Sequence, residues 1–204
     1  MFTGIVQALC PVVTLERKPG LTHFCIEMPP ELVGDLRTGA SVAVDGVCLT
    51  AVSVEGTRVG FDAMEETLAK TTIGELEVAD AVNVERCARM GGEIGGHPMS
   101  GHVCAQAQIL DVQESENNKV MTFRVPLAWM RFIFSKGFIA LDGASLTVVD
   151  ADPAQGTFKV WFIPETLRLT RFGTKTVGDK VNVEIDPQTQ VIVETVERIM
   201  KERK

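Results

Sequence analysis

Two pairs of small polar residues offer the most chemistry in this sequence. Cys48 and Thr50 follow one Asp-Gly turn, and Ser145 and Thr147 follow another. Residues two apart on a strand share a face, so each pair sets a thiol or a hydroxyl beside a threonine. Such groups form hydrogen bonds with the edge of a flat polar heterocycle. We therefore expect two similar pockets for a ring-shaped ligand.

These polar pairs recur because the chain repeats itself. Residues 45–50 (Asp-Gly-Val-Cys-Leu-Thr) match residues 142–147 (Asp-Gly-Ala-Ser-Leu-Thr) at an offset of 97, and residues 82–85 match residues 181–184 at an offset of 99. The change of two arises mainly at residues 151–156, which read as a turn where a fold tolerates insertion. Matching blocks in one order indicate two copies of one domain.

The positions at which the copies differ suggest unlike roles for the two pockets. Cys48 corresponds to Ser145, Ser41 to Phe138, and Ile5 to His102. Histidine is the natural proton carrier near neutral pH. Structural drift would also produce such differences, but a reaction between two identical molecules in different roles needs like pockets with unlike reactive groups.

The elements that must position these residues are predicted to be short strands. Each half has β-branched segments that alternate with a period of two and are separated by turn signals, which is typical of a small closed barrel. Short helical turns are expected to begin near Glu66 and Glu165. The predicted strands comprise residues 41–44, 49–54, 58–61 and 80–85 in the first half and residues 138–141, 145–149 and 158–162 in the second.

The tail after Pro187 is predicted to be a helix with one apolar face. Ile192, Val196 and Ile199 fall at i, i+4 and i+7, and basic residues stand at its end, where the helix dipole favours cations. This apolar face requires a partner. Packing on its own barrel and packing on the same helix in other subunits are both compatible with the pattern.

Composition excludes several classes of protein. The chain has 204 residues, with 20 Lys and Arg against 27 Asp and Glu, and the net charge of −7 argues against nucleic acid or an anionic membrane as a partner. We expect neither a signal peptide nor a membrane span. The five cysteines include no CxxC pair, so free thiols in a reducing cytoplasm are expected.

The usual catalytic motifs are not found in the sequence. The glycines near residue 91 match neither a dinucleotide-binding loop nor a P-loop, and no serine lies in a GxSxG turn. His97, His102 and Cys104 are the best candidates for metal ligands, but the remaining ligands and the usual spacings are missing. We predict no metal site.

Several motifs together resemble the riboflavin synthase family. They cover nearly the whole chain in order and comprise Met1 to Val6, Gly46 to Thr50, Gly96-His97, Ser100-Gly101-His102, Lys136-Gly137, Asp142 to Thr147 and Ile163 to Leu167. The resemblance implies a mainly β fold of two tandem, similar six-stranded Greek-key barrels plus a C-terminal helix. It divides the chain into an N-terminal lumazine-binding barrel (1–97), a C-terminal lumazine-binding barrel (98–187) and an oligomerisation helix (188–204).

The resemblance also implies an activity and an assembly. The activity is the cofactor-free dismutation of two molecules of 6,7-dimethyl-8-ribityllumazine, which yields riboflavin and 5-amino-6-(D-ribitylamino)uracil. The assembly is a cytoplasmic homotrimer whose active sites lie between the first barrel of one subunit and the second barrel of its neighbour. An association with lumazine synthase is left open.

Site residues follow from the resemblance position by position. His102 is expected to transfer protons, Cys48 or Ser41 to activate water or add to one ring, and Ser145 with Asp142 and Thr147 to position the partner molecule. The first pocket would be lined by Gly4, Ile5, Val6, Cys48, Leu49, Thr50, Asp62, Ala63, Met64, Glu65, Glu66, Thr67, Gly101, His102 and Val103. The second would be lined by Lys136, Ser145, Leu146, Thr147, Trp161, Phe162, Ile163, Pro164, Glu165 and Thr166. Segments 4–6 and 101–103 are repeat equivalents, so each could serve the opposite barrel.

Two other functions compete with catalysis. A non-catalytic carrier of a lumazine or flavin chromophore would be expected to lose reactive groups and one pocket, whereas both polar sets persist here. A flavin reductase would need a nicotinamide-binding domain, and the sequence has no βαβ pattern to supply one. The sequence therefore favours the enzyme.

Overall fold

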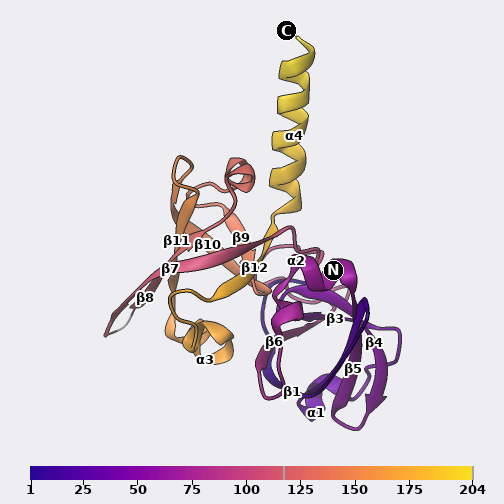
Figure 1. Cartoon of the computed structure of the whole chain (residues 1–204). Helices are drawn as coiled ribbons and strands as arrows, with labels where there is room; N and C mark the ends of the chain where they lie inside the picture. The colour runs from indigo at the N-terminus through magenta and orange to yellow at the C-terminus, as the bar shows by residue number, and fades with distance from the viewer. Residues whose placement is uncertain (117, 204) are drawn as a thin grey trace.

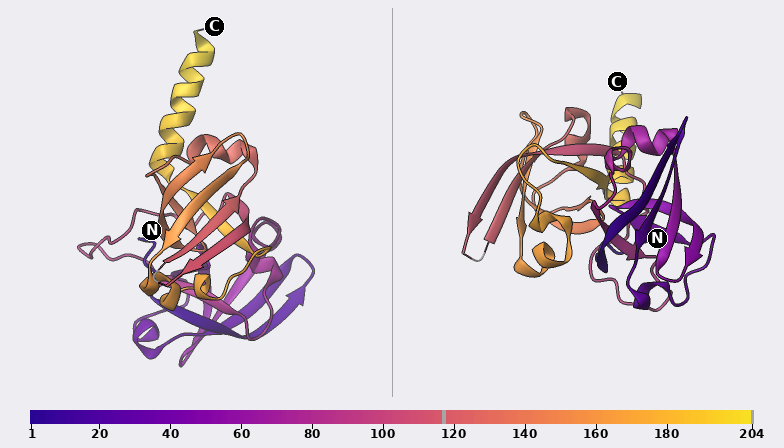
Figure 2. Two further views of the ribbon diagram at one scale, coloured as in Figure 1. Left: turned by 90° about the vertical axis from the view of Figure 1, so that its left-hand side faces the viewer. Right: turned by 60° about the horizontal axis from the view of Figure 1, so that its bottom comes forward.

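The computed structural model describes residues 1–116 and 118–203. Two barrels lie side by side, and a long C-terminal helix, α4 (Pro187–Glu202), projects away from them (Figure 1). The left view of Figure 2 shows α4 leaving the second barrel and extending beyond both barrels. This arrangement confirms the predicted duplicated β fold with a C-terminal helix.

The first barrel is closed by six antiparallel strands in the order β1-β2-β5-β4-β3-β6. The strand β2 pairs with β5 rather than β3, which is the Greek-key arrangement predicted above. The strands are β1 (Ala8–Lys18), β2 (Leu21–Glu27), β3 (Ser41–Val44), β4 (Val47–Glu55), β5 (Arg58–Met64) and β6 (Ala81–Arg86). Short helices α1 (Pro30–Val33), α2 (Glu65–Lys70) and η1 (Thr72–Glu75) connect them.

The second barrel repeats the same cyclic order, β7-β8-β11-β10-β9-β12. Its strands are β7 (Ala105–Ser115), β8 (Asn118–Arg124), β9 (Phe138–Leu141), β10 (Ala144–Asp152), β11 (Thr157–Phe162) and β12 (Lys180–Ile185). Its short helices are η2 (Leu127–Phe132), α3 (Pro164–Leu169) and η3 (Arg171–Gly173). Both α2 and α3 lie where the sequence predicts helical turns.

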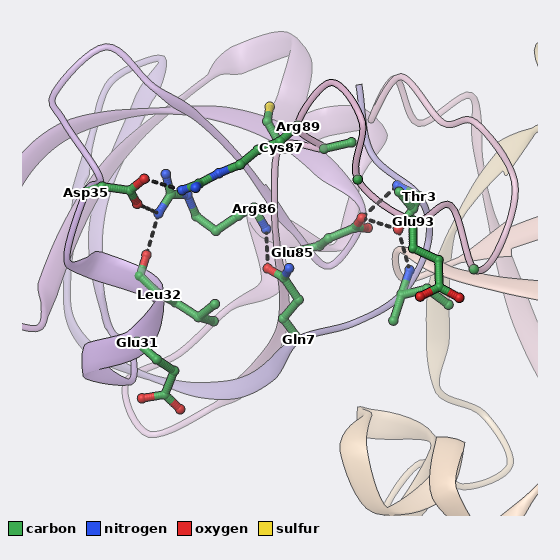
Figure 3. Close-up of a pocket in the computed structure, with 14 residues that line it drawn as sticks. Thr3, Gln7, Glu31, Leu32, Asp35, Glu85, Arg86, Cys87, Arg89 and Glu93 are labelled. Carbon is green, nitrogen blue, oxygen red and sulfur yellow. Dashed lines mark hydrogen bonds and ion pairs between the residues drawn. The ribbon is translucent and has the colours of Figure 1, made fainter.

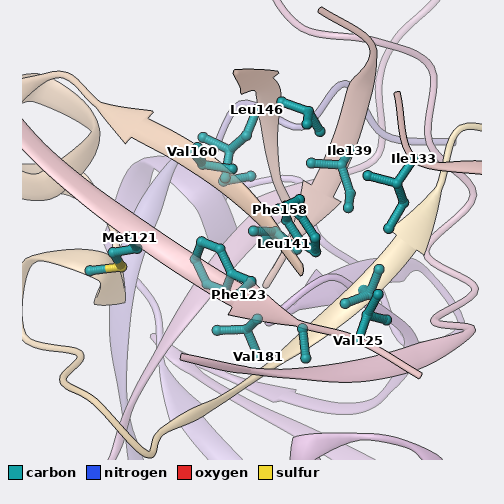
Figure 4. Close-up of a cluster of buried hydrophobic side chains, with 14 of the residues drawn as sticks. Met121, Phe123, Val125, Ile133, Ile139, Leu141, Leu146, Phe158, Val160 and Val181 are labelled. Atoms are coloured by element: carbon teal, nitrogen blue, oxygen red, sulfur yellow. The ribbon is translucent and has the colours of Figure 1, made fainter. Parts of the chain in front are cut away.

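Each barrel has its own apolar core because alternate strand residues face inward. In the second barrel the rings of Phe123 and Phe158 come from β8 and β11 and stack with their centroids 5.3 Å apart (Figure 4). The opposite, outward faces of the strands carry the polar residues. The chemistry predicted from the sequence therefore lies on the outer faces of the barrels.

The two Asp-Gly turns meet between the barrels. Gly46 and Gly143 touch, and a Cβ at Gly46 would lie 2.5 Å from the backbone nitrogen of Gly143. Asn83 Nδ2 donates to the carbonyl of Asp142 across 2.9 Å, and Asn182 Nδ2 donates to the carbonyl of Asp45 across the same distance. The repeated Asp-Gly and Asn residues thus join the two halves in a reciprocal way.

The helix α4 begins with Asp186, whose carboxylate accepts hydrogen bonds from the backbone of Gln188 and Thr189. Beyond its midpoint, Glu197 forms an ion pair with Arg131 of η2 at 2.6 Å. Its large apolar side chains remain 43 to 64% exposed, and they are Val191, Ile192, Val196, Ile199 and Met200. Most of the apolar face is therefore not covered by its own barrel.

Candidate functional site

Two equivalent chain segments, 3–4 and 100–101, are fixed by buried glutamates. Thr3 donates to Glu85 Oε1 from its backbone nitrogen and its hydroxyl, at 2.6 and 2.7 Å, and the Gly4 nitrogen donates to Glu85 Oε2 at 2.9 Å. Ser100 and Gly101 make the same three bonds to Glu184. Burial raises the pKa of Glu85, although the hydrogen bonds from Thr3 and Gly4 oppose that shift.

After these anchors each segment crosses to the other barrel. The Gly4 carbonyl accepts a hydrogen bond from the Ser145 nitrogen at 2.8 Å, and the Gly101 carbonyl accepts one from the Cys48 nitrogen at 2.9 Å. The following Val6 lies in the core of the second barrel. Both glycines have left-handed backbone, with φ of +76° and +80°, and a Cβ on either would lie within 2.6 Å of the residue opposite.

This crossing corrects one assignment made from the sequence. Gly4, Ile5 and Val6 were expected to line the first pocket with Cys48, but they lie against Ser145 and the second barrel. The sequence left the exchange of the two segments open because the repeat makes them equivalent. The structure places Gly101 to Val103 at the first barrel and Gly4 to Val6 at the second.

The first barrel carries a cavity of about 330 Å³ that contains much of the predicted first site. Its lining residues are Val47, Cys48, Glu66, Thr67, Lys70, Thr71, Gly101, His102 and Val103. Cys48 is half-buried and His102 is exposed. Ser41 pairs with Thr50 across the β3 and β4 ladder on the same outer face as Cys48. The volume suits a small bicyclic ligand.

The equivalent position of the second barrel is covered by a histidine. His97 Nδ1 lies 2.6 Å from Ser145 Oγ, and its ring stacks on Phe138 with centroids 5.1 Å apart. Burial lowers the pKa of His97 against the attraction of Asp186 and Glu184, so the ring is neutral near pH 7. Nε2 is buried without a hydrogen-bond partner among the residues that the structure describes.

His97 was part of a motif that carries the family resemblance and a candidate metal ligand, but it was not predicted as a catalytic or substrate-binding residue. Its position just before the second repeat gave a weak signal, because the first copy has no residue there to compare. A neutral imidazole against a hydroxyl is the arrangement of a general base with its partner. Thr147 is also exposed, on the same strand face as Ser145.

Other predicted binding residues are more dispersed. Leu49, Ala63, Leu146 and Phe162 turn their side chains into the barrel cores, so only their backbone groups are available to a ligand. The carboxylate of Asp62 contacts His23 at 2.7 Å. The remaining members are exposed or half-buried, and they are Met64, Glu65, Lys136, Trp161, Ile163, Pro164, Glu165 and Thr166.

Asp142 is fully buried between the barrels. Its Oδ1 accepts a hydrogen bond from the Asn182 nitrogen at 2.7 Å, and its Oδ2 lies 3.4 Å from Lys175 Nζ. Asp45, its repeat equivalent, pairs with Arg171 at 2.5 Å. Contact with a substrate would require the Asp142 carboxylate to leave these partners, so its surroundings fit a structural role better than the predicted positioning role.

A cavity of about 610 Å³, larger than the one beside Cys48, lies on the first barrel beside residues 85–95 and was not anticipated from the sequence (Figure 3). Arg86 and Arg89 both pair with Asp35 there, and Arg86 also donates to the Leu32 carbonyl at 2.5 Å. Both arginines on this wall are thus already paired with Asp35. Across the described residues, no helix is both long and apolar enough to cross a membrane.

Comparison with known proteins finds one family along the whole chain. A model of the lumazine binding domain matches residues 3–87 and again residues 100–186. Riboflavin synthase of Escherichia coli (strain K12) is 48% identical over 204 residues, covering 100% of this chain and 95% of that protein. Riboflavin synthase of Chlamydia pneumoniae is 45% identical over 200 residues, covering 98% and 97%.

Solved structures extend the comparison to bound ligands. LumP complexed with riboflavin has a TM-score of 0.85, and LumP complexed with 6,7-dimethyl-8-(1'-D-ribityl) lumazine has a TM-score of 0.82. Both are 25% identical to this chain and cover 91% of it, and the alignments cover 100% and 99% of the LumP chains. The two domain matches coincide with the two copies of the repeat.

Proposed function

Because the chain belongs to the riboflavin synthase family, we propose that it joins two molecules of 6,7-dimethyl-8-ribityllumazine in a dismutation. One lumazine transfers a four-carbon unit to the other, and the products are riboflavin and 5-amino-6-(D-ribitylamino)uracil. This proposal rests mainly on the match to curated riboflavin synthases over the whole chain. The chain is thus an enzyme of the transferase class, and its named relatives do not favour a non-catalytic chromophore carrier.

The first pocket is proposed to hold one lumazine against the outer face of β3 and β4. The cavity beside Cys48 supports this, since Glu66, Thr67 and His102 surround it with hydrogen-bonding groups. Ser41 and Thr50 extend the same polar face. A flat heterocycle would lie on that face, with its polar edge toward the start of α2.

The second pocket is proposed to hold the other lumazine beside Ser145 and Thr147. The crossing segment Gly4 to Val6 would form one wall, and Trp161 to Thr166 another. The Ser145 hydroxyl is already oriented by His97 at 2.6 Å. Because the hydroxyl replaces the thiol of Cys48, the two bound molecules meet different reactive groups.

The reaction needs a proton to leave a methyl carbon of one lumazine, and the lumazine ring delocalises the resulting charge. We propose that exposed His102, at the mouth of the first pocket, carries protons there. Cys48 or Ser41 would activate water or add to the ring. Holding two molecules in a reactive orientation would contribute several further kcal/mol, about 7 or more in favourable cases.

Assembly is proposed to complete each active site. The exposed apolar face of α4 supports association of three copies through their C-terminal helices, which would bring the first barrel of one subunit toward the second barrel of its neighbour. The chain would then divide at 97/98 and 187/188 as predicted from the sequence. The free cysteines support a reducing compartment such as the cytoplasm. Association with lumazine synthase stays a prediction.

The test is to mix the purified protein with 6,7-dimethyl-8-ribityllumazine, without metal or nucleotide, and to measure lumazine consumed against riboflavin formed. Two consumed for each riboflavin formed is the expected ratio. Tight binding without riboflavin would make the protein a carrier. The variant His102→Gln should slow turnover by about 100-fold while lumazine affinity is retained, and an equal loss of both would contradict its proposed role.

A further inference from the structure

A second group of reactive side chains lies on the outer face of the first barrel. His23 and Cys25 stand two apart on β2, with their side chains opposite to the buried Phe24 and Ile26. The neighbouring strand β5 pairs Asp62 with His23 and Gly60 with Cys25. Three chemically active groups therefore lie together on two adjacent strands.

Their geometry is that of a thiol, a base and an orienting carboxylate. His23 Nδ1 lies 2.7 Å from Asp62 Oδ1, and His23 Nε2 lies 3.7 Å from Cys25 Sγ. A carboxylate only accepts hydrogen bonds, so Nδ1 carries the proton and donates it to Asp62. In the neutral ring Nε2 is then the acceptor for the Cys25 thiol, which is the arrangement that activates a sulfur nucleophile.

The absence of a side chain at Gly60 lets neighbouring polar groups pack closely beside this sulfur. Gly60, opposite Cys25, has no side chain, and a Cβ there would lie 2.4 Å from Ser53 Oγ, 3.2 Å from His23 Cε1 and 3.4 Å from Cys25 Sγ. The position above Gly60 is thus filled by the Ser53 hydroxyl, the imidazole and the thiol, which brings these three groups together. The side chains of His23 and Asp62 are 32% and 40% exposed, so the group is open to solvent.

The other cysteines lack this arrangement. Burial raises the pKa of the Cys10 thiol to about 12 and that of Cys104 to about 11, so both are poor nucleophiles. Cys48 and Cys87 are half-buried, and within residues 1–116 and 118–203 no hydrogen bond joins either of them to a histidine. The groups that face Cys25 and His23 are Glu16 and Lys18 from β1, Glu27 from β2, Ser53 from β4, and Arg58 and Asp62 from β5.

We propose that Cys25, His23 and Asp62 form a reactive thiol site at which Cys25 is modified by low-molecular-weight disulfides. His23 Nε2 accepts the thiol proton, and the Cys25 thiolate attacks one sulfur of the disulfide. The disulfide bond breaks as the new bond forms, and the departing thiolate takes the proton from the imidazolium. One disulfide and one protein thiol become one mixed disulfide and one free thiol.

The test measures exchange of the full, reduced protein with glutathione disulfide, and peptide mapping by mass spectrometry gives a rate for each cysteine. Cys25 should react at least about tenfold faster than Cys48 near pH 7. The variant His23→Asn should lower the Cys25 rate about tenfold and move its pH profile toward that of a simple thiol. The control Glu27→Gln, two residues beyond Cys25 on the same strand face, should leave the rate unchanged.

If His23→Asn fails to fold, Asp62→Asn provides the second test. The amide keeps the shape and polarity of the side chain but removes the charge that stabilises the imidazolium, so the Cys25 rate should fall several-fold. Equal Cys25 rates in the wild type and both variants would overturn the proposal. So would a Cys25 that reacts no faster than Cys48. The readout is thiol exchange, so the result does not depend on lumazine turnover.

Discussion

At the scale of single residues, the contact between His97 and Ser145 makes a prediction about turnover. If the neutral imidazole orients and deprotonates the hydroxyl, His97→Gln and Ser145→Ala should each lower kcat, by roughly 10- to 100-fold. Because the two side chains act as a unit, the double variant should be no slower than the slower single variant. Steady-state kinetics of all three variants tests this. Multiplication of the two losses would show that the residues act independently.

A second residue, Asp142, makes a prediction about pH. Burial is the main cause that raises its pKa from 3.8 to about 6, with Lys175 opposing the shift and Asp45 adding to it. The native state then holds its proton to higher pH than the unfolded chain, so this group stabilises the fold less as pH rises from about 4 to about 6. Relative to Asp142→Asn, the wild type should lose unfolding free energy across that range and then level off.

Urea unfolding of both proteins at pH 4.5, 5.5, 6.5 and 7.5 measures that difference. The asparagine retains an oxygen to accept the Asn182 hydrogen bond, so the comparison isolates the charge. A wild type that gains stability relative to the variant as pH rises would mean that ion pairing, rather than burial, governs Asp142.

At the scale of elements, the sequence predicted most of the strands correctly because they alternate and end at glycine turns. β3, β9, β4 and β10 flank the repeated Asp-Gly turns and were identified on both copies. No strand was predicted at β1, β2, β7, β8 or β12. The equivalent strands β1 and β7 share little sequence, and the same holds for β2 and β8. The packing of the two turns against each other could not be predicted, because the contact between Gly46 and Gly143 joins residues far apart in sequence.

That contact predicts unequal costs for two similar substitutions. Gly20 and Gly46 have φ of +71° and +78°, but a Cβ at Gly20 meets nothing within 4 Å, whereas one at Gly46 meets the backbone of Gly143. Gly20→Ala should cost about 1 kcal/mol of unfolding free energy, from its backbone conformation alone. Gly46→Ala should cost about 2 kcal/mol more, because the barrels must move apart. Equal costs by urea unfolding would contradict a tight contact between the barrels.

At the scale of the whole molecule, the repeat predicted two barrels and two sites but could not say which segments served which site. The exchange of Gly4 to Val6 and Gly101 to Val103 is invisible in sequence because equivalent residues fit either barrel. His97 was not predicted as a site residue for a related reason. Its contact with Ser145 joins residues far apart in the sequence. Local alternation determines a barrel, whereas a site built from crossing segments depends on tertiary contacts.

The apolar face of α4 is the part of the molecule that we propose packs against other copies of the chain. Its apolar side chains Ile192, Val196 and Ile199 stay exposed along one stripe, whereas Glu194 and Glu197 on α4 pair with Arg131 of the second barrel. A lysine in that stripe would place a charge inside a packed helical assembly, which is strongly unfavourable. Val196→Lys should therefore convert the proposed trimer into monomers with both barrels still folded, as sedimentation and circular dichroism would show. Lys201→Glu changes the charge on the opposite side of the helix and should leave the assembly intact.

If the active site needs two subunits, Val196→Lys should also lose riboflavin formation while each chain still binds lumazine. A monomer with full activity would contradict the shared site.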